Sequence, residues 1–124
     1  MRLLLDAHAL MWWAADIDLS SAAREAIADA GNEVWVSAAT AWEISIKRAR
    51  GRLDWPEDIV AAIQQNGFIA LSIRVEHAIA AGELPPIHGD PFDRMLVAQA
   101  QSEGLTVVAR DADIARYEVA VLPA

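Results

Sequence analysis

The sequence contains no cysteine. This absence excludes disulfide bridges, zinc thiolate sites and catalysis by a thiol, and an oxidising compartment is not indicated. Long apolar runs are also missing: the run at residues 3–5 ends at Asp6, far short of a signal-peptide core or a membrane span. We therefore expect a cytoplasmic protein with no membrane partner.

Positive charge is scarce as well. Ten basic side chains stand against 18 acidic ones, which gives a formal net charge of −8 and argues against a broad basic surface for nucleic acid. Any polyanionic substrate would need local cations. Basic residues do cluster at Lys47, Arg48, Arg50 and Arg52. They could contact an RNA backbone, or they could only favour the negative end of a helix and add solubility.

Large apolar residues, by contrast, are plentiful. The chain of 124 residues is 55% hydrophobic and has five tryptophans, which predicts one globular domain over residues 1–124. We expect most of four tryptophans to pack in the core: Trp12, Trp13, Trp42 and Trp55. A surplus on the surface would mark a dimer or partner interface.

Short apolar segments alternate with helical patterns along the chain. Strands are predicted at residues 3–5, 34–37, 68–73 and 105–109, with a peripheral strand at 119–122. Helices are predicted at residues 7–15, about 20–30, 38–50, 56–66, 75–83 and 91–103. The alternation implies right-handed crossovers and a mostly parallel sheet covered on both faces, which is a three-layer α/β/α fold.

The helix at residues 91–103 has the clearest start signals. Asp90 stands at the N-cap, Pro91 at N1 and Asp93 at N3, and all three residue types favour a helix start at those positions. Taken alone, either aspartate could serve only as a cap that complements the positive end of the helix.

Acidic residues recur near the predicted strand ends. Asp6 follows the first strand directly, and Asp111 follows the fourth after one further residue. Glu43 lies early in the helix after the second strand. Ligands bind at the carboxyl ends of parallel strands, so these residues and Asp93 could converge at one edge of the sheet.

Each of these acids also has a purely structural interpretation. Asp6 could simply end its strand, Asp111 could cap a short helix over residues 112–116, and Glu43 could pair with Lys47 one turn later. The apolar neighbours of Glu43 favour a concave site. Among the histidines, His8 and His88 could be ligands or bases but are more often structural, and His77 is predicted to lie on the surface.

Three segments and a late aspartate together resemble the PIN domain, and most closely the VapC-type toxins of toxin-antitoxin pairs. The segments are residues 3–10, 36–44 and 88–100, with Asp111. The resemblance implies a Mg²⁺- or Mn²⁺-dependent ribonuclease that a partner antitoxin holds inactive. It also implies that the catalytic and metal-binding residues are Asp6, Glu43, Asp93 and Asp111, with Asp90 as an additional acid. We expect a homodimer as well.

Physical chemistry leads to the same mechanism. Several carboxylates close together cannot all stay ionised without a cation, and oxygen ligands without cysteine or histidine clusters select Mg²⁺ or Mn²⁺. Such an ion would lower the pKa of a bound water and neutralise charge on a phosphate, which suits phosphodiester hydrolysis.

Two positions depart from the family pattern. Ala7 stands where threonine is usual, and Ala109 replaces a hydroxyl residue; these hydroxyls usually support the site by hydrogen bonding. An alternative function is therefore a catalytically weak or inactive binding module that keeps the antitoxin and dimer contacts. A phosphate-accepting receiver domain fits poorly, because it needs a lysine after a late strand and this chain has only Lys47.

Overall fold

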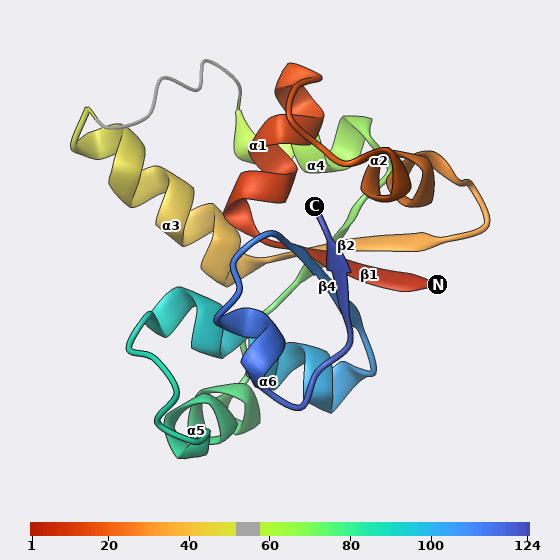
Figure 1. Ribbon diagram of the computed structural model, residues 1–124. Helices are drawn as coiled ribbons and strands as arrows, with labels where there is room; N and C mark the ends of the chain where they lie inside the picture. Colours follow the sequence, from red (N-terminus) through yellow and green to blue (C-terminus); the bar gives the residue numbers. More distant parts are fainter. Residues whose placement is uncertain (52–57) are drawn as a thin grey trace.

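The computed structural model describes residues 1–51 and 58–124. Its centre is a five-stranded sheet in the order β3-β2-β1-β4-β5, in which every neighbouring pair is parallel. The strands are β1 (Arg2–Leu5), β2 (Glu33–Ser37), β3 (Ile69–Leu71), β4 (Thr106–Ala109) and β5 (Val121–Pro123). The predicted α/β fold with a parallel sheet is confirmed (Figure 1).

The helices follow the predicted order. They are α1 (Ala7–Ala15), α2 (Ser21–Ala28), α3 (Ala38–Ala49), α4 (Ile59–Gln65), α5 (Val75–Glu83) and α6 (Pro91–Glu103), with a short 3-10 helix η1 (Ile114–Arg116). The fourth helix was expected from Pro56, which lies outside the described residues; α4 begins after Asp58, whose carboxylate accepts from the Val60 N–H at 2.9 Å. No helix in residues 1–51 and 58–124 is long and apolar enough to cross a membrane.

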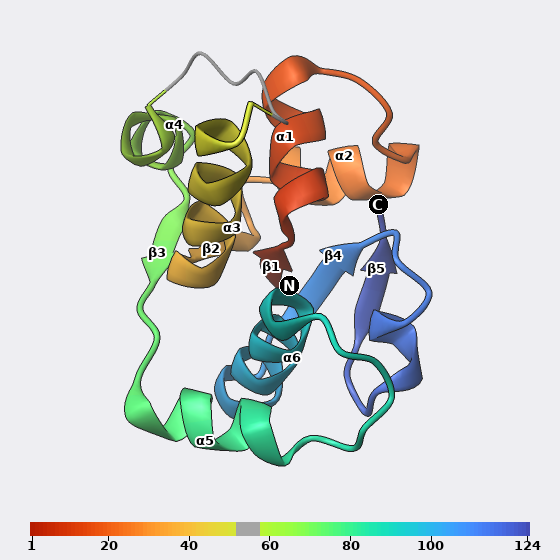
Figure 2. The ribbon, with the colours of Figure 1, turned by 90° about the vertical axis from the view of Figure 1, so that its left-hand side faces the viewer.

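Strand β1 lies at the centre of the sheet, and its residues 3–5 are fully buried. Leu3 and Leu5 belong to one apolar cluster and Leu4 to another, because successive side chains of a strand point to opposite faces. Helices α1, α2 and α4 cover the first face and α6 covers the second, with α5 packed against α6 (Figures 1 and 2). Helix α3 contacts both α1 and α6. The expected three layers are therefore present.

The strand order reverses between β1 and β4. From β1 the chain crosses to β2 and then β3 on one side, whereas β4 and β5 lie on the other. Since all strands are parallel, their carboxyl ends share one edge, and that edge at the reversal point is where such sheets bind ligands. Helix α6 precedes β4, so its first turn lies at this same edge.

Helix α6 has the boundaries that its sequence predicts. The Asp90 carboxylate accepts from the N–H groups of Phe92 at 2.9 Å and Asp93 at 3.0 Å. At the other end Gly104 has φ of 68°, a left-handed conformation that glycine adopts without the penalty of a side chain.

The position of His77 contradicts the sequence prediction. It was expected on the surface, but its side chain is completely buried between α5 and α6. Its Nδ1 accepts from the Arg74 backbone N–H at 3.0 Å, and its Nε2 lies 3.0 Å from the Glu103 carboxylate. The partner that satisfies this histidine is 26 residues away, so local patterning gives no sign of the burial.

Gln99 connects several elements inside the second layer. It is fully buried; its Oε1 accepts from the Ser37 hydroxyl at 2.6 Å, and its Nε2 donates to the Ser72 carbonyl at 3.2 Å. The Ser37 hydroxyl also accepts from the Ala39 N–H at 3.0 Å and so caps α3. Helices α3 and α6 are thereby joined by one buried hydrogen bond.

We predict that Gln99→Ala lowers the free energy of unfolding by about 2–3 kcal/mol, because it leaves buried hydrogen-bonding groups unpaired and opens a cavity. Gln101→Ala on the same helix is the matched control. Gln101 is exposed and donates to the Glu118 carbonyl, so its loss should cost less than about 1 kcal/mol. Urea unfolding of both variants measures the difference, and equal losses would contradict the role assigned to Gln99.

Candidate active site

Asp6 is the most deeply buried acid at the carboxyl edge of the sheet. It is 4% exposed, and it caps α1 by accepting from the Ala9 N–H at 2.7 Å. Burial is the main cause that raises its pKa from 3.8 to about 6. The negative charges of Glu43 and Asp111 raise the pKa further, whereas the Ala9 hydrogen bond and Lys47 oppose the rise.

Asp93 lies in the first turn of α6 in a similar electrostatic environment. Burial again contributes most to raising its pKa from 3.8 to about 6, followed by the charge of Asp90 and, more weakly, by Asp111 and Asp6. Its hydrogen bond with His88 acts in the opposite direction. The charges of Asp6, Asp93 and Asp111 therefore act on one another across the sheet edge.

Glu43 combines the two interpretations that its sequence context allowed. Its carboxylate pairs with Lys47 at 2.9 Å, as the spacing on α3 predicted. It also lines a pocket of about 300 Å³ between α3 and the start of α6. The other residues that line this pocket are Ile46, Lys47, Arg50, Asp90, Pro91 and Phe92.

Asp111 is exposed and has a local structural role as well. Its carboxylate accepts from the Asp113 N–H at 2.8 Å, which stabilises the turn that leads into η1. The cap anticipated for a helix over residues 112–116 is not formed: the helix is a single 3-10 turn, its N-cap is Asp113, and that residue makes no side-chain cap hydrogen bond. The charge of Asp111 nevertheless reaches both Asp6 and Asp93.

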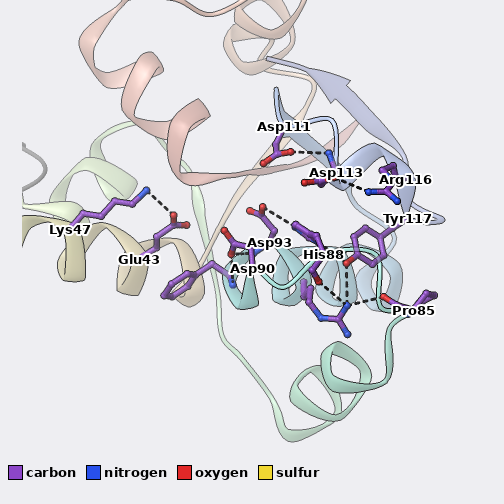
Figure 3. A network of polar contacts seen from close by, with 12 residues as sticks. Glu43, Lys47, Pro85, His88, Asp90, Asp93, Asp111, Asp113, Arg116 and Tyr117 are labelled. Atoms are coloured by element: carbon purple, nitrogen blue, oxygen red, sulfur yellow. Dashed lines mark hydrogen bonds and ion pairs between the residues drawn. The ribbon is translucent and has the colours of Figure 1, made fainter.

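The side chains do not enclose an ion as they stand. Among residues 1–51 and 58–124, no group of three or more histidine, aspartate or glutamate residues is arranged to hold a metal. Instead, Glu43 faces Lys47 and Asp93 faces His88 (Figure 3). The donors are carboxylate oxygens, which is the chemistry that Mg²⁺ and Mn²⁺ prefer, so the residue types fit such an ion although their side chains point to other partners.

A polar chain beside Asp93 was missed by the sequence analysis. His88 contacts Asp93 through Nε2 and the Tyr117 hydroxyl through Nδ1, and Arg94 donates to the same hydroxyl (Figure 3). The sequence suggests that His88 is a ligand, a base or a structural residue, but it does not indicate that His88 links Asp93 to Tyr117. Tyr117 carries no local signal, because its partners come from a segment more than 20 residues earlier.

The four basic residues predicted to contact RNA do not form one group. Lys47 and Arg50 line the pocket with Glu43. Arg48 lies on another side of α3, in a hollow shared with Asp58 and Ile59 of the α4 region. Arg52 lies outside the described residues.

The tryptophans also differ in position. Trp12 and Trp13 are partly buried and pack against the first apolar cluster. Trp42 is 61% exposed, and its ring meets that of Phe92 edge-on with centroids 5.2 Å apart. Trp55 lies outside the described residues. One of the large apolar groups is thus a surface residue next to the pocket.

Known protein families and curated proteins include clear matches to this chain. The family model for the PIN domain matches residues 3–120. A curated relative, the ribonuclease VapC22 of Mycobacterium tuberculosis, is 31% identical over 112 residues, which cover 87% of this chain and 85% of the relative.

Solved structures share the fold at lower sequence identity. The DNA-bound VapBC complex of Salmonella typhimurium contains a chain with a TM-score of 0.69 and 18% identity, with 98% of this chain and 97% of that chain covered. A chain of VapBC2 from Rickettsia felis, bound to a DNA fragment from their promoter, has a TM-score of 0.68 and 13% identity, with 98% of both chains covered.

We predict that Asp6→Asn stabilises the metal-free protein at pH 7.5 by about 1–3 kcal/mol, since it removes a buried charge. The folded-state pKa of Asp6 is raised to about 6, so the folded protein binds more protons than the unfolded chain between pH 4 and 6. The wild type should therefore lose stability as pH rises through this window, and the variant should lose less.

Chemical unfolding at several pH values, in the presence of a chelator, measures both effects. Glu25→Gln is the control, because it makes the same charge change at an exposed position of α2. A destabilised Asp6→Asn protein, with the pH dependence of the wild type, would contradict the electrostatic description of this site.

Proposed function

The chain belongs to the PIN-domain family, and from this premise we propose that it is a VapC-type ribonuclease that hydrolyses RNA at the carboxyl edge of its sheet. The observation that carries the proposal is the position of Asp6 and Asp93. Both acids are withdrawn from water beside further carboxylates, and their pKa values are raised to about 6. Acids with perturbed pKa values that lie near one another at a strand-reversal point are typical of a catalytic site.

Dependence on a divalent metal is general among VapC ribonucleases, and for this chain we propose Mg²⁺ or Mn²⁺. Asp6, Glu43 and Asp93 would hold the ion, and Asp111 would hold a second ion or orient the attacking water. When bound, the ion supplies an activated water and neutralises charge that develops on the phosphate. Asp90 caps α6 and adds negative charge beside Asp93.

The residues around the ion site have distinct tasks in this proposal. Asp6 is held by the first turn of α1, which gives the site one fixed carboxylate. Glu43 would hold the cation in place of its partner Lys47, which would leave the Lys47 ammonium group available to the substrate. With Arg50 it would contact RNA phosphates across the 300 Å³ pocket, which supplies local cations to a strongly acidic protein.

Protein partners follow from the same family membership. Two of the solved structures similar to this chain are VapBC complexes. We propose a cognate antitoxin that covers the acidic residues of the candidate site and the pocket beside Glu43, and we propose a homodimer. The exposed Trp42 beside the pocket is suited to such an interface, since aromatic residues are enriched in the buried centres of interfaces. With RNA as the substrate, the site of action is the cytoplasm.

A catalytically weak binding module is the second candidate function. Ala7 and Ala109 are buried and carry methyl groups where the family usually has hydroxyls, so the hydrogen bonds from those hydroxyls are missing. Such a module would bind its antitoxin and dimerise without cutting RNA. The two candidates differ in one measurable property, which is metal-dependent cleavage.

We predict that the purified protein, freed of its antitoxin, cleaves single-stranded RNA with Mg²⁺ or Mn²⁺ and loses this activity in excess chelator. Asp6→Asn and Asp93→Asn should each lower the rate at least about a hundredfold, because ion binding or water activation is lost. Gel analysis of labelled RNA gives the rates, with Glu25→Gln as the control. Undiminished cleavage in chelator would refute the metal-dependent reaction, and a metal-loaded protein without cleavage would favour the binding module.

A further prediction separates the basic residues by position on α3. Arg50→Ala should raise KM for RNA about fivefold to tenfold and reduce its dependence on salt, with little change in kcat, because one phosphate contact is lost. Arg48→Ala should leave KM within about twofold, since Arg48 faces the α4 region. Rates measured at several salt concentrations test this, and equal effects of the two variants would contradict it.

A further inference from the structure

His88 is held between two polar groups at the edge of the site. Its Nδ1 lies 2.7 Å from the Tyr117 hydroxyl, and its Nε2 lies 3.3 Å from Oδ2 of Asp93. The side chains of His88 and Asp93 are each only 13% exposed, and Tyr117 is buried. Water therefore competes little for these contacts.

The direction of each hydrogen bond follows from the donors. Arginine can only donate, so the contact of 3.1 Å from Arg94 Nη1 makes the Tyr117 oxygen an acceptor. The hydroxyl proton of Tyr117 is not used in that contact, and Nδ1 of His88 at 2.7 Å is the acceptor within its reach when the ring proton is on Nε2. The ring proton of a neutral His88 then resides on Nε2, where it is donated to the Asp93 carboxylate. The opposite tautomer would set a ring lone pair against that carboxylate.

Arg94 is itself firmly anchored. Its guanidinium also donates to the carbonyls of Pro85 at 2.8 Å, Leu84 at 3.0 Å and Ala81 at 3.1 Å. These groups belong to the end of α5 and the loop that follows it, whereas Tyr117 follows η1. Arg94 thus joins the end of α5 and its following loop, through three carbonyls, to the segment after η1, through the Tyr117 hydroxyl.

We propose that Arg94, Tyr117 and His88 form a positioning chain that sets the Nε2–H tautomer of His88 and thereby orients Asp93. With Oδ2 engaged by His88, the other carboxylate oxygen is left to a divalent cation. None of the three residues is catalytic; they act through Asp93, as outer hydrogen-bond partners commonly orient metal-binding carboxylates. The link to a cation rests on the proposed function, whereas the tautomer follows from the contacts alone.

The protein contains a second histidine of the same design, away from the site. Nδ1 of His77 accepts the Arg74 backbone N–H, and its Nε2 faces Glu103. This pair joins α5 to α6 but has no acid of the candidate site as a partner among its described contacts. It is a matched control for the structural effect of losing a histidine–carboxylate contact.

The experiment combines nitrogen NMR of the imidazoles with calorimetric titration of Mn²⁺ alone into the full-length protein. At pH 8 the wild-type His88 should carry its proton on Nε2. Tyr117→Phe should give a mixture of tautomers and weaken Mn²⁺ binding about tenfold, and His88→Ala should weaken it about tenfold to a hundredfold. His88→Gln should restore most of the affinity, because its amide can donate to Asp93 and accept from Tyr117. His77→Gln should lower stability and leave Mn²⁺ affinity within about twofold.

Separate results would overturn the separate parts. An Nδ1–H or doubly protonated His88 in the wild type would refute the positioning chain even if Mn²⁺ binds normally. Unchanged Mn²⁺ affinity in both Tyr117→Phe and His88→Ala would also refute it, and would leave these residues as links between backbone segments. Failure of the wild type to bind Mn²⁺, with His88 protonated on Nε2, would instead overturn the metal-dependent reaction and the chain's link to a cation.

Discussion

A carboxylate buried at the end of the central strand is the constraint on which the rest of the site depends. Asp6 is almost inaccessible to water, and burying a charge is costly unless other groups compensate. The compensation visible here is limited to the first turn of α1 and the more distant Lys47. Glu43 and Asp111 add further negative charge near Asp6. The edge of the sheet therefore carries uncompensated negative charge, which a cation would neutralise.

The topology explains why this negative charge arises at one place. Strands β1 and β4 are neighbours although more than 100 residues of chain separate their starts, so Asp6 and Asp111 approach each other without local pairing. Helix α6 adds Asp93 because the helix begins at the same edge before it leads into β4. The two apolar clusters on the faces of the sheet hold these elements in register.

The parts of the structure that could be predicted are those with local signals. Helix α6 has its cap, its proline and its terminal glycine within its own sequence, and the apolar strands showed that the acids after them would share an edge. The helical period could also have separated Arg48 from Lys47 and Arg50, since residues 43, 47 and 50 lie three or four apart on one face. Neighbouring positions in the sequence of a helix, such as Lys47 and Arg48, point to different sides of it.

Long-range partners account for what could not be predicted. The burial of His77 depends on Glu103, and the role of Tyr117 depends on Arg94 and His88; none of these pairs has a periodic or capping signature. The contact between Asp93 and His88 was likewise hidden, whereas the pair of Glu43 with Lys47 follows from their spacing on α3. Glu43 and Asp93 turn to Lys47 and His88 rather than to each other, because like charges separate when suitable hydrogen-bond donors are within reach.

The hydrogen bond between Ser37 and Gln99 has an implication for how related sequences can diverge. Ser37 starts the helix that carries Glu43, and Gln99 lies within the helix that carries Asp93. The Ser37–Gln99 hydrogen bond therefore helps to fix the position of Glu43 relative to Asp93, although neither acid takes part in it. A change at either position alone leaves a buried polar group without its partner, whereas a joint change to another hydrogen-bonding pair of matching volume does not. Positions 37 and 99 should consequently drift as a pair among descendants of this chain, even though 62 residues separate them.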